Sequence, residues 1–466
     1  MHRPLLVSIL AGLVACGGDA GPPRPPGAPA ALVSNTGDGA FSVGWSAPRS
    51  DGGAAIRDYV VSVTPAVSGG GVTAGRTALL GDATNGTTYT VSVAARNAAG
   101  TGPARTIDVT PRAYAAAGEQ LLEIAGDDSP SGVFDPSVVV SGAQAWLAYS
   151  SVDYHVNGQG HRVQDVGIRI ARSDDGGATW TYVRTVAAPG AAALADPGEA
   201  VCGAPVCEGR WAYETSWLVE DPAAPAAERF RLYAHQYFLY PPHANAAGQS
   251  ATKYPLGAIV VWTAASPDQL GGAPRTALRW SLTPASFTGG VDVNGLGSAL
   301  ASCLVVAEGS ATVRGGQMDL VLTCIEPGAD PLPQKIVLLR SADHGRSFAY
   351  VRTLLEAGDA VWLGASHFTA PALLAGPDAA PVLVVTPSYG GVYRGCAVIP
   401  FEDADAGTLR RIGDMPAFLR FDPTPDGTMG GACAPARLSG FGLLRSQASG
   451  LDGWPPVFRI VRGAGL

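Results

Sequence analysis

Residues 173–180 read SDDGGATW and residues 341–348 read SADHGRSF, so the chain carries two copies of the pattern Ser-x-Asp-x-Gly-x-Ser/Thr-aromatic. Alternating apolar residues precede each copy, and the similar runs TYVRTV and AYVRTL follow. This order predicts a strand, a tight turn and a returning strand. In such a turn, short Ser and Asp side chains hydrogen-bond to backbone N–H groups, glycine supplies a positive φ angle and the aromatic side chain packs. The residues in these places are Ser173, Asp175, Gly177 and Trp180 in the first copy and Ser341, Asp343, Gly345 and Phe348 in the second.

Both copies resemble the Asp box, the BNR repeat of bacterial sialidases and related β-propellers. The resemblance implies an all-β chain that contains a sialidase-like propeller. In that family, Asp boxes lie on outer hairpins, far from the mouth where ligands bind. We therefore expect both copies to be structural, and we expect the functional residues to lie elsewhere.

The start of the chain resembles a bacterial lipoprotein signal. A basic beginning is followed by an apolar run over residues 5–14, and Cys16 directly follows Leu-Val-Ala. This run is too short to span a bilayer permanently. We predict a signal peptide with a lipobox over residues 1–16, lipidation of Cys16 and delivery to the bacterial outer membrane or cell surface; a plain cleaved signal is the alternative. Residues 17–28 are rich in Pro and Gly, which predicts a tether.

Composition bounds the remaining function classes. The chain has 466 residues, a formal net charge of −8 and 47% hydrophobic residues. It is long enough for more than one core, and its acidic balance argues against a nucleic-acid partner. The sequence has no Gly-x-Ser-x-Gly motif, phosphate-binding loop or metalloprotease His pair. We therefore expect neither serine nucleophile chemistry nor nucleotide use. We also expect no cofactor and no metal, and we expect the protein to be a monomer.

Residues 29–112 have the spacing of a small β-sandwich. Short alternating stretches (FSVGW, DYVVSV, YTVSVAARN) are separated by turn residues about every ten positions. The stretch resembles a fibronectin type III domain, in which Trp45 would fill the core and Tyr89 would be the corner tyrosine that hydrogen-bonds to the backbone. We expect a spacer, with weak carbohydrate or protein contact as the alternative role. The residues that carry the resemblance are Pro29, Trp45, Tyr59, Leu80 and Tyr89.

Residues 119–466 read as strands and turns. Five segments repeat one order, namely an inner strand, a second strand and a hairpin at the Asp-box position. We predict a five-bladed β-propeller whose last blade is completed by LLEIA near Leu121. A sixth blade within residues 271–295 is the alternative, because sialidases have six. The predicted inner strands are FDPSVVV near Asp135, YETSWLV near Glu214, LASCLVV near Cys303, FTAPALL near Thr369 and ACAPARL near Cys433.

The six cysteines after Cys16 all fall in the predicted propeller, as suits an exported, oxidised protein. Cys303 and Cys324 would face each other across a hairpin about Val313, and Cys202 and Cys207 would close a small loop. Cys396 and Cys433 are the two cysteines that remain. A zinc site is the alternative. The expected disulfides are Cys303–Cys324, Cys202–Cys207 and Cys396–Cys433.

Two acidic residues are the candidates for catalysis. Aligning the five inner strands places Asp135 and Glu214 at one equivalent position on neighbouring blades. Hydrolysis of a glycosidic bond needs such a pair, with one carboxylate ionised and the other protonated. The alternative is structural: Asp135 would cap the start of a strand and Glu214 would pair with an arginine.

The phrases DPSVVV and YETSWLVED resemble the inner-strand acidic segments of five-bladed glycoside hydrolases of the arabinanase and xylosidase type. In that family, an Asp that opens the first blade is the general base and a Glu on a later blade is the general acid. The resemblance thus makes Asp135 the base and Glu214 the acid. Two departures remain: the family's third acidic residue has no counterpart in the alignment, and Glu214 falls on the second blade rather than the third.

Sialidase chemistry requires three arginines that hold the substrate carboxylate, a Tyr nucleophile assisted by a Glu, and an acid/base Asp. The family's Phe/Tyr-Arg-Ile-Pro motif is absent, and LLEIAGDDSP stands in its place. No motif selects the residues that would do this chemistry. The residues with the required types are Arg231, Arg314, Arg394 and Arg437, with Tyr389 or Tyr393.

Polar and aromatic residues beside the expected mouth are candidates for ligand binding. One group lies in a loop after the second strand of the first blade and would bind sugar hydroxyls or a cation, or form a solvated rim. The second group would stack on or hydrogen-bond to a sugar, or lie between blades. The first group is Asp153, Tyr154, His155, His161 and Asp165, and the second is Trp217, Trp262, His235, His367, Trp362 and Arg394.

The sequence therefore supports two hypotheses. In the first, a surface-anchored glycoside hydrolase acts on extracellular glycans through Asp135 and Glu214. In the second, a non-catalytic surface propeller binds glycans or another protein.

Overall fold

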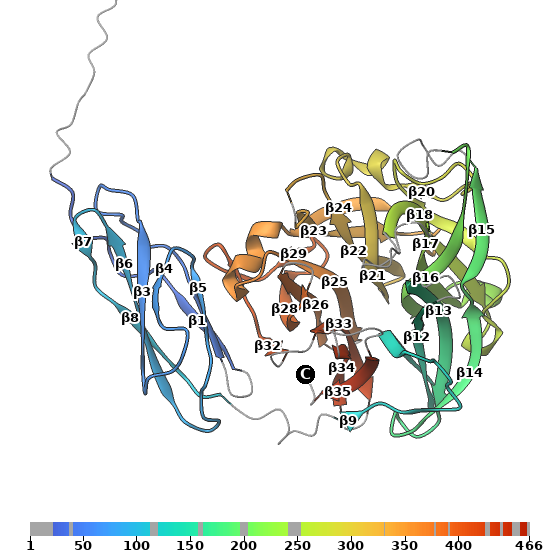
Figure 1. Ribbon diagram of the computed structural model, residues 1–466, viewed down its shortest axis with the longest axis horizontal. Coiled ribbons are helices and arrows are strands. Elements are labelled where there is room, and N and C mark those ends of the chain that lie inside the picture. The colour runs from blue at the N-terminus through green and yellow to red at the C-terminus, as the bar shows by residue number, and fades with distance from the viewer. Residues whose placement is uncertain are drawn as a thin grey trace, which may run out of the picture.

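The computed structural model describes the protein as two regions built from β-strands and short 3-10 helices (Figure 1). No helix in the described part of the chain is long and apolar enough to cross a membrane. The predicted signal peptide with Cys16 lies outside the described residues, as do His161 and Cys202. The described residues are 22–36, 41–111, 120–156, 162–195, 204–240, 253–329, 331–376, 379–389, 392–424, 429–438, 441–449 and 457–463.

The N-terminal region consists of two facing sheets. Their buried core contains Trp45 and Tyr59, whose rings meet edge to face at 5.4 Å, together with Leu80. The backbone N–H of Thr84 donates to the Tyr89 hydroxyl at 2.8 Å, which confirms the predicted corner tyrosine. One sheet contains β1 (Leu32–Thr36), β2 (Phe41–Trp45) and β5 (Thr77–Leu80), and the other β3 (Asp58–Thr64), β4 (Gly71–Thr73), β6 (Tyr89–Asn97), β7 (Gly100–Thr101) and β8 (Arg105–Val109).

Part of the predicted tether is bound to this domain. The backbone N–H groups of Arg24 and Gly27 donate to the carbonyls of Gly52 and Ser50, each at 2.9 Å. The Asn97 side chain, which is 2% exposed, donates to the Arg24 carbonyl at 2.7 Å. Residues 24–27 therefore extend the sandwich instead of hanging free.

The C-terminal region begins with three groups of mainly antiparallel strands that follow one another along the chain, in which β19 and β20 form a parallel pair. The first contains β11 (Gly132–Ser141), β12 (Gln144–Val156), β13 (Arg162–Ser173) and β14 (Trp180–Ala187). The second contains β15 (Gly190–Ala195), β16 (Val206–Glu220), β17 (Phe230–Leu239), β18 (Lys253–Ala264), β19 (Arg275–Arg279) and β20 (Val291–Asp292). The third contains β21 (Val305–Arg314), β22 (Gln317–Ile325), β23 (Gln334–Ser341) and β24 (Ala349–Leu355).

Two further groups complete the region, and a two-stranded hairpin lies beside them. The fourth contains β25 (His367–Gly376), β26 (Ala379–Tyr389), β27 (Val392–Tyr393), β28 (Gly395–Asp403), β29 (Thr408–Leu409) and β32 (Arg420–Pro423). The fifth contains β33 (Met429–Leu438), β34 (Phe441–Ser449), β35 (Val457–Gly463) and β9 (Gln120–Leu121). The hairpin consists of β30 (Arg411–Ile412) and β31 (Met415–Pro416).

One strand from each group lies against its counterparts in the neighbouring groups, and these five strands are called the inner strands: β11, β16, β21, β25 and β33. Each inner strand contacts the next inner strand along the chain, and the last one, β33, contacts the first one, β11. The start and end of the region also meet, because β9 pairs with β35 as predicted for LLEIA. The next strand, β10 (Ile124–Ala125), instead pairs with β14, so LLEIA and its neighbours form two short strands. Residues 271–295 supply β19 and β20 to the second sheet.

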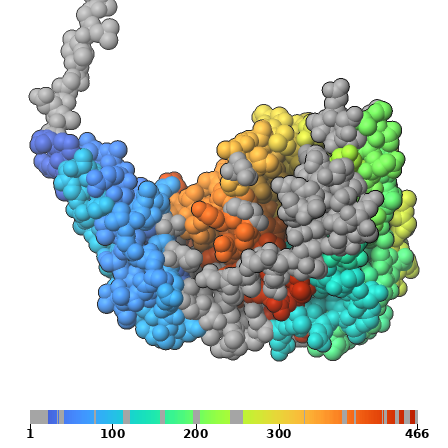
Figure 2. All heavy atoms as spheres, in the orientation of Figure 1, coloured from blue at the N-terminus to red at the C-terminus, as the bar shows by residue number. Residues whose placement is uncertain are grey.

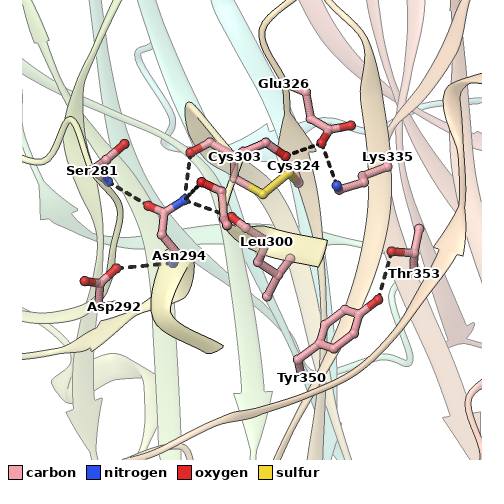
Figure 3. The surroundings of a disulfide bond; sticks show 12 residues. Ser281, Asp292, Asn294, Leu300, Cys303, Cys324, Glu326, Lys335, Tyr350 and Thr353 are labelled. Carbon is pink, nitrogen blue, oxygen red and sulfur yellow. Dashed lines mark hydrogen bonds and ion pairs between the residues drawn. A yellow bond between two sulfur atoms is a disulfide. The ribbon is translucent and has the colours of Figure 1, made fainter. Parts of the chain in front are cut away.

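The third inner strand was predicted too early. Residues 298–300 form the 3-10 helix η6 (Ser298–Leu300), and the strand starts at Val305. The Asn294 side chain holds this turn by donating to the carbonyls of Leu300 and Cys303 at 2.8 and 3.0 Å (Figure 3). The apolar run LASCLVV thus begins as a capped turn, and only its end is strand.

Both hairpins at the repeated pattern have the expected turn chemistry. The Ser173 hydroxyl accepts from the Gly177 N–H at 2.8 Å, and Asp175 accepts from the Thr179 N–H at 2.9 Å. Trp180 is buried and its indole N–H donates to the Gly177 carbonyl. In the second copy Ser341, Asp343, Gly345 and Phe348 repeat these arrangements, with hydrogen bonds to Gly345 and Ser347 N–H groups and a buried ring.

Two of the expected disulfides are present, Cys303–Cys324 (Figure 3) and Cys396–Cys433. Cys207 is also disulfide-bonded. Its expected partner, Cys202, lies outside the described residues.

The two regions form separate lobes (Figure 2) that touch through η7 (Ala357–Leu363). The Arg76 guanidinium of the N-terminal sandwich lies 4.4 Å from the centre of the Trp362 ring. Trp362 is only 2% exposed. Its predicted role as a ligand-stacking residue is therefore wrong, because the ring is covered by the neighbouring domain.

Candidate functional site

The inner strands surround a cavity of about 480 Å³. Each of them has one non-glycine residue with a left-handed backbone, and a break in strand register accompanies that residue. An extra residue at such a β-bulge changes the direction of the neighbouring side chains. The bulge residues and their φ angles are Asp135 (49°), Thr215 (51°), Glu308 (43°), Ala370 (43°) and Ala432 (46°), and all five line the cavity.

The bulges correct the sequence alignment. Asp135 is equivalent to Thr215, so Glu214 lies one position earlier and the predicted equivalence of Asp135 and Glu214 is wrong. The true acidic counterpart of Asp135 is Glu308, on the third inner strand. Sequence reasoning missed Glu308 because it placed that strand too early. The available signal was an acidic residue directly before Gly309-Ser310, as Asp135 stands before Pro136-Ser137.

Backbone N–H groups at three of the bulges donate hydrogen bonds to the preceding sheet. The Thr215 N–H donates to Asp135 Oδ2 at 3.1 Å, and the Ala370 N–H donates to Glu308 Oε2 at 2.9 Å. In the same way, the N–H of Ala432 donates to the Thr386 hydroxyl at 2.9 Å. The bulges therefore supply hydrogen-bond donors at the cavity as well as side chains.

Asp135 is held firmly and lies only 8% exposed. Its N–H donates to Ser446 Oγ at 2.8 Å, and Ser150 Oγ donates to Asp135 Oδ2 at 3.0 Å. Burial raises the pKa of Asp135 to about 7, and the charges of Glu214 and Glu308 act in the same direction. Asp135 thus titrates near neutral pH.

Tyrosine hydroxyls contact the other two carboxylates. Tyr237 on β17 donates to Glu214 Oε2 at 3.0 Å. Tyr393 on β27 donates to Glu308 Oε1, while the Thr369 hydroxyl donates to Glu308 Oε2. Burial and the nearby carboxylates raise the pKa of both tyrosines well above its ordinary value, so each is a hydrogen-bond donor.

The predicted binding histidines differ in their surroundings. His235 is buried, and its ring centre lies 5.2 Å from that of Tyr237. In the pairing of β16 with β17, His235 is the residue opposite Glu214. His367 is 3% exposed beside Ser366 Oγ, and burial lowers its pKa. His155 is about two-fifths exposed and lies 3.3 Å from Asp153. Only His235 is thus placed next to a site carboxylate by these contacts.

Two predicted tryptophans belong to the core. Trp217 is 1% exposed and stacks on Tyr233 with ring centres 5.4 Å apart. Trp262 is 3% exposed, and its indole N–H donates to the Gly272 carbonyl. Neither ring is exposed for stacking on a sugar, so that role is wrong for both.

The arginines expected for sialidase chemistry whose side chains are described, Arg231, Arg314 and Arg394, do not line the cavity, and the side chain of Arg437 lies outside the described part of the structure. Arg231 pairs with Glu228 at 2.9 Å, and Arg314 pairs with Asp319 at 3.3 Å. Arg394 follows Tyr393, and its backbone bridges to Gly430. Among the described residues that line the cavity, none is Arg, Lys or His. Tyr389 is 60% exposed, whereas Tyr393 forms a Tyr–Glu pair.

The arrangement can hold a proton and a negative charge in one cavity. Asp135 titrates near neutrality beside two further carboxylates, so one protonated and one ionised carboxyl group can coexist there. The described residues contain no group of three or more His, Cys, Asp or Glu side chains placed to hold a metal ion. The chemistry that these side chains themselves support is proton transfer.

Comparisons with known proteins bear on both regions. Residues 24–110 match the family described as "Fibronectin type III domain", which confirms the fold predicted for the N-terminal region. No curated protein sequence matches the chain.

Solved structures with similar folds include glycoside hydrolases. A family 117 glycoside hydrolase from Zobellia galactanivorans has a TM-score of 0.42 at 13% identity over 74% of this chain and 89% of that one. An arabinanase from Bacillus subtilis has a TM-score of 0.41 at 11% identity over 74% and 96%. The catalytic domain of an α-L-arabinofuranosidase from Coprinopsis cinerea has a TM-score of 0.39 at 10% identity over 74% and 94%.

Proposed function

We propose that the C-terminal region is a five-bladed β-propeller that hydrolyses glycosidic bonds in extracellular glycans, using Asp135 and Glu308 as the acid/base pair. The observation that carries this proposal is the position of both carboxylates at equivalent bulges on one cavity. Five inner strands that contact each other in a cycle, with β9 paired to β35, support the blade count.

Hydrolysis needs one carboxyl group to protonate the leaving oxygen while another removes a proton from the attacking water. The C–O bond breaks as a new C–OH bond forms, and the two carboxyl groups exchange protonation states. The resemblance to arabinanase-type enzymes makes the first-blade Asp135 the base, and it now makes Glu308, on the third blade, the acid. Glu214 takes the place of the third acidic residue.

The pH decides when Asp135 can act as the base. Burial, together with the charges of Glu214 and Glu308, raises the pKa of Asp135 to about 7. Asp135 is therefore mostly protonated below this pH, and above it the ionised carboxylate can accept a proton from the attacking water.

The charge of the cavity favours a neutral glycan. Its described lining includes Asp135 and Glu308 but no Arg, Lys or His. A sialic or uronic acid would bring its own carboxylate next to these groups without a cationic partner. Sialidase activity is therefore a poorer fit than hydrolysis of uncharged sugars.

The first test is sugar release by the purified protein from a panel of neutral and sialylated glycans. Asp135→Asn and Glu308→Gln are expected to lower release about 10³-fold. The exposed residues Asp128 and Glu402 (side chains 86% and 65% exposed) offer Asp128→Asn and Glu402→Gln as matched controls that should leave release unchanged. A folded protein that releases nothing but is retained on a glycan array would support the non-catalytic alternative.

Synthetic substrates separate the two roles. An aryl glycoside with a good leaving group needs no protonation, so it should restore much of the rate to Glu308→Gln and little to Asp135→Asn. Rescue of the Asp135 variant instead would reverse the assignment.

We also propose lipid anchoring at Cys16, with the fibronectin type III domain holding the propeller away from the membrane. The basis is the lipobox-like sequence before Cys16. Palmitate labelling that persists in Cys16→Ala would overturn it.

A further inference from the structure

Glu308 is surrounded by donors from a neighbouring sheet. Tyr393 on β27 and Thr369 on β25 both belong to the fourth sheet, whereas Glu308 belongs to the third. The Tyr393 hydroxyl donates to one carboxylate oxygen, and the Thr369 hydroxyl and Ala370 N–H donate to the other. Both oxygens of Glu308 are therefore oriented by groups that come from across a sheet boundary.

We propose that Tyr393 is a positioning residue that fixes the orientation of the Glu308 carboxylate and governs how readily this carboxylate takes up a proton. This inference rests on the proposed function, in which Glu308 is the general acid. Hydrogen bonds to a carboxylate favour its charged form. Removing the Tyr393 hydroxyl should make Glu308 easier to protonate and leave its carboxylate less firmly held.

The other ionisable groups near Glu308 act in the opposite direction. Asp135 on β11 and Glu214 on β16 are the carboxylates whose charges interact with the same cluster. Their repulsion favours protonation of a neighbour, whereas Tyr393 favours ionisation. Tyr393 thus supplies a hydrogen-bond donor within a cluster of three carboxylates.

The two tyrosines of the site are not equivalent. Tyr237 lies on β17, in the same sheet as Glu214, so its hydrogen bond is formed within one sheet. Tyr393 joins two sheets at the cavity. Its short strand β27 pairs with β26, and the next residue, Arg394, bridges to Gly430 of the fifth group. Tyr393 is therefore placed by backbone contacts on both sides.

A nucleophilic role for Tyr393 is the competing explanation. A Tyr–Glu pair is what the sialidase resemblance would use. However, burial and Glu308 raise the pKa of Tyr393 well above its ordinary value, which opposes formation of a phenolate. The hydroxyl is accordingly better suited to donate than to attack.

The test compares Tyr393→Phe with Tyr389→Phe. Tyr389 lies nearby in the same sheet but is 60% exposed, so it provides a matched control. Protein labelled with ¹³C at glutamate carboxyls is titrated by NMR, and the Glu308 signal is assigned by its loss in Glu308→Gln. Loss of a hydrogen bond to a charged group predicts that the Glu308 midpoint rises by about 1 to 2 pH units in Tyr393→Phe. No shift is expected in Tyr389→Phe.

Activity gives a second readout. In Tyr393→Phe, kcat should fall about tenfold with little change in KM, and the alkaline limb of the pH–rate profile should move to higher pH. Thr369→Val, which removes the other hydroxyl donor, should move the Glu308 midpoint in the same direction. It serves as a second variant if Tyr393→Phe does not fold.

The outcomes separate this inference from the proposed function. A shifted Glu308 midpoint in a protein that hydrolyses no glycan would retain the role of Tyr393 and reject the hydrolase. An active Tyr393→Phe enzyme with an unchanged midpoint would overturn the positioning role. Complete loss of activity, with a sugar found covalently attached to Tyr393 in the wild type, would make Tyr393 the nucleophile instead.

Discussion

The first three inner strands and the last two share one backbone device but present different chemistry. All five have a left-handed residue at the cavity, yet Asp135 and Glu308 occupy this position in the first and third strands, and Ala370 and Ala432 occupy it in the fourth and fifth. On the fourth strand the bulge supplies an N–H group that donates to Glu308. The acids are therefore concentrated on the first three inner strands, and the fourth sheet supports Glu308 through the Ala370 N–H and through the Thr369 and Tyr393 hydroxyls.

This difference teaches that the bulge does not by itself determine the chemistry of the cavity. It aims the strand at the cavity whatever side chain it carries, and alanine is tolerated there. The charge of the site is set by which strands carry acids. The first three inner strands are called the acid side, and the last two, with Ala370 and Ala432, the alanine side. Variants that change each side separately can test this division.

The largest expected effect on stability comes from removing the charge of Asp135. Its pKa in the folded protein is about 7, compared with an ordinary value of 3.8. Between these values the folded state binds more protons than the unfolded state, so stability falls as pH rises from about 4 to about 7. The full difference corresponds to roughly 4 kcal/mol at about 1.4 kcal/mol per pKa unit.

Urea unfolding between pH 4 and pH 8 measures this effect. Asp135→Asn should lose less stability than the wild type as pH rises, and it should be the more stable protein at pH 8. Asp128→Asn, at an exposed position, should follow the wild-type curve. Parallel curves for the wild type and Asp135→Asn would show that Asp135 is not buried among like charges.

A second prediction concerns the alanine side. Cys433 directly follows the bulge residue Ala432 and is bonded to Cys396 on β28, across a sequence separation of 37 residues. This bond joins the fifth inner strand to the fourth sheet. Replacing both cysteines by alanine should lower the free energy of unfolding by about 3 kcal/mol, because the unfolded chain loses a closed loop.

Because no acid lies at this bulge, the same double variant should keep the rate of the proposed glycan hydrolysis within a few-fold of the wild-type rate at temperatures where it stays folded. Thermal unfolding and kcat are the paired measurements. A large loss of kcat without a loss of stability would show that the alanine side takes a direct part in the chemistry.

Features fixed by local sequence were predicted well. The two hairpins follow from the spacing of Ser, Asp, Gly and an aromatic residue, and Ser173 and Asp175 make the expected bonds. Trp45 and Tyr89 identified the sandwich because both side chains are buried in the core of one small domain, where Tyr89 also bonds to the nearby backbone of Thr84. In each case the residues that define the feature are close together in the sequence or belong to one small core.

The composition of the site was only half predictable. Asp135 and Glu214 were identified, but Glu308 was missed because a capped 3-10 turn shifts the start of its strand. Register at a bulge depends on pairing with β22, which no apolar pattern reveals. Trp362 was misassigned for a similar reason, since its burial is completed by a different domain. Side chains defined by contacts between distant segments were therefore the ones that sequence reasoning lost.

The smallest expected effect tests the bulge itself. Ala432 has a φ of 46°, a left-handed conformation that disfavours any residue with a Cβ. Ala432→Gly relieves this strain but makes the unfolded chain more flexible, so a net gain of up to about 1 kcal/mol is expected. Ala434, two residues later on the same strand and 5% exposed, has no positive φ and provides the matched control. Ala434→Gly should instead destabilise the protein by about 1 kcal/mol, because it removes a buried methyl group without relieving strain. Opposite signs in urea unfolding would establish that the left-handed bulge is a strained feature kept for the cavity, whereas equal losses would show that Ala432 is no more strained than its neighbours.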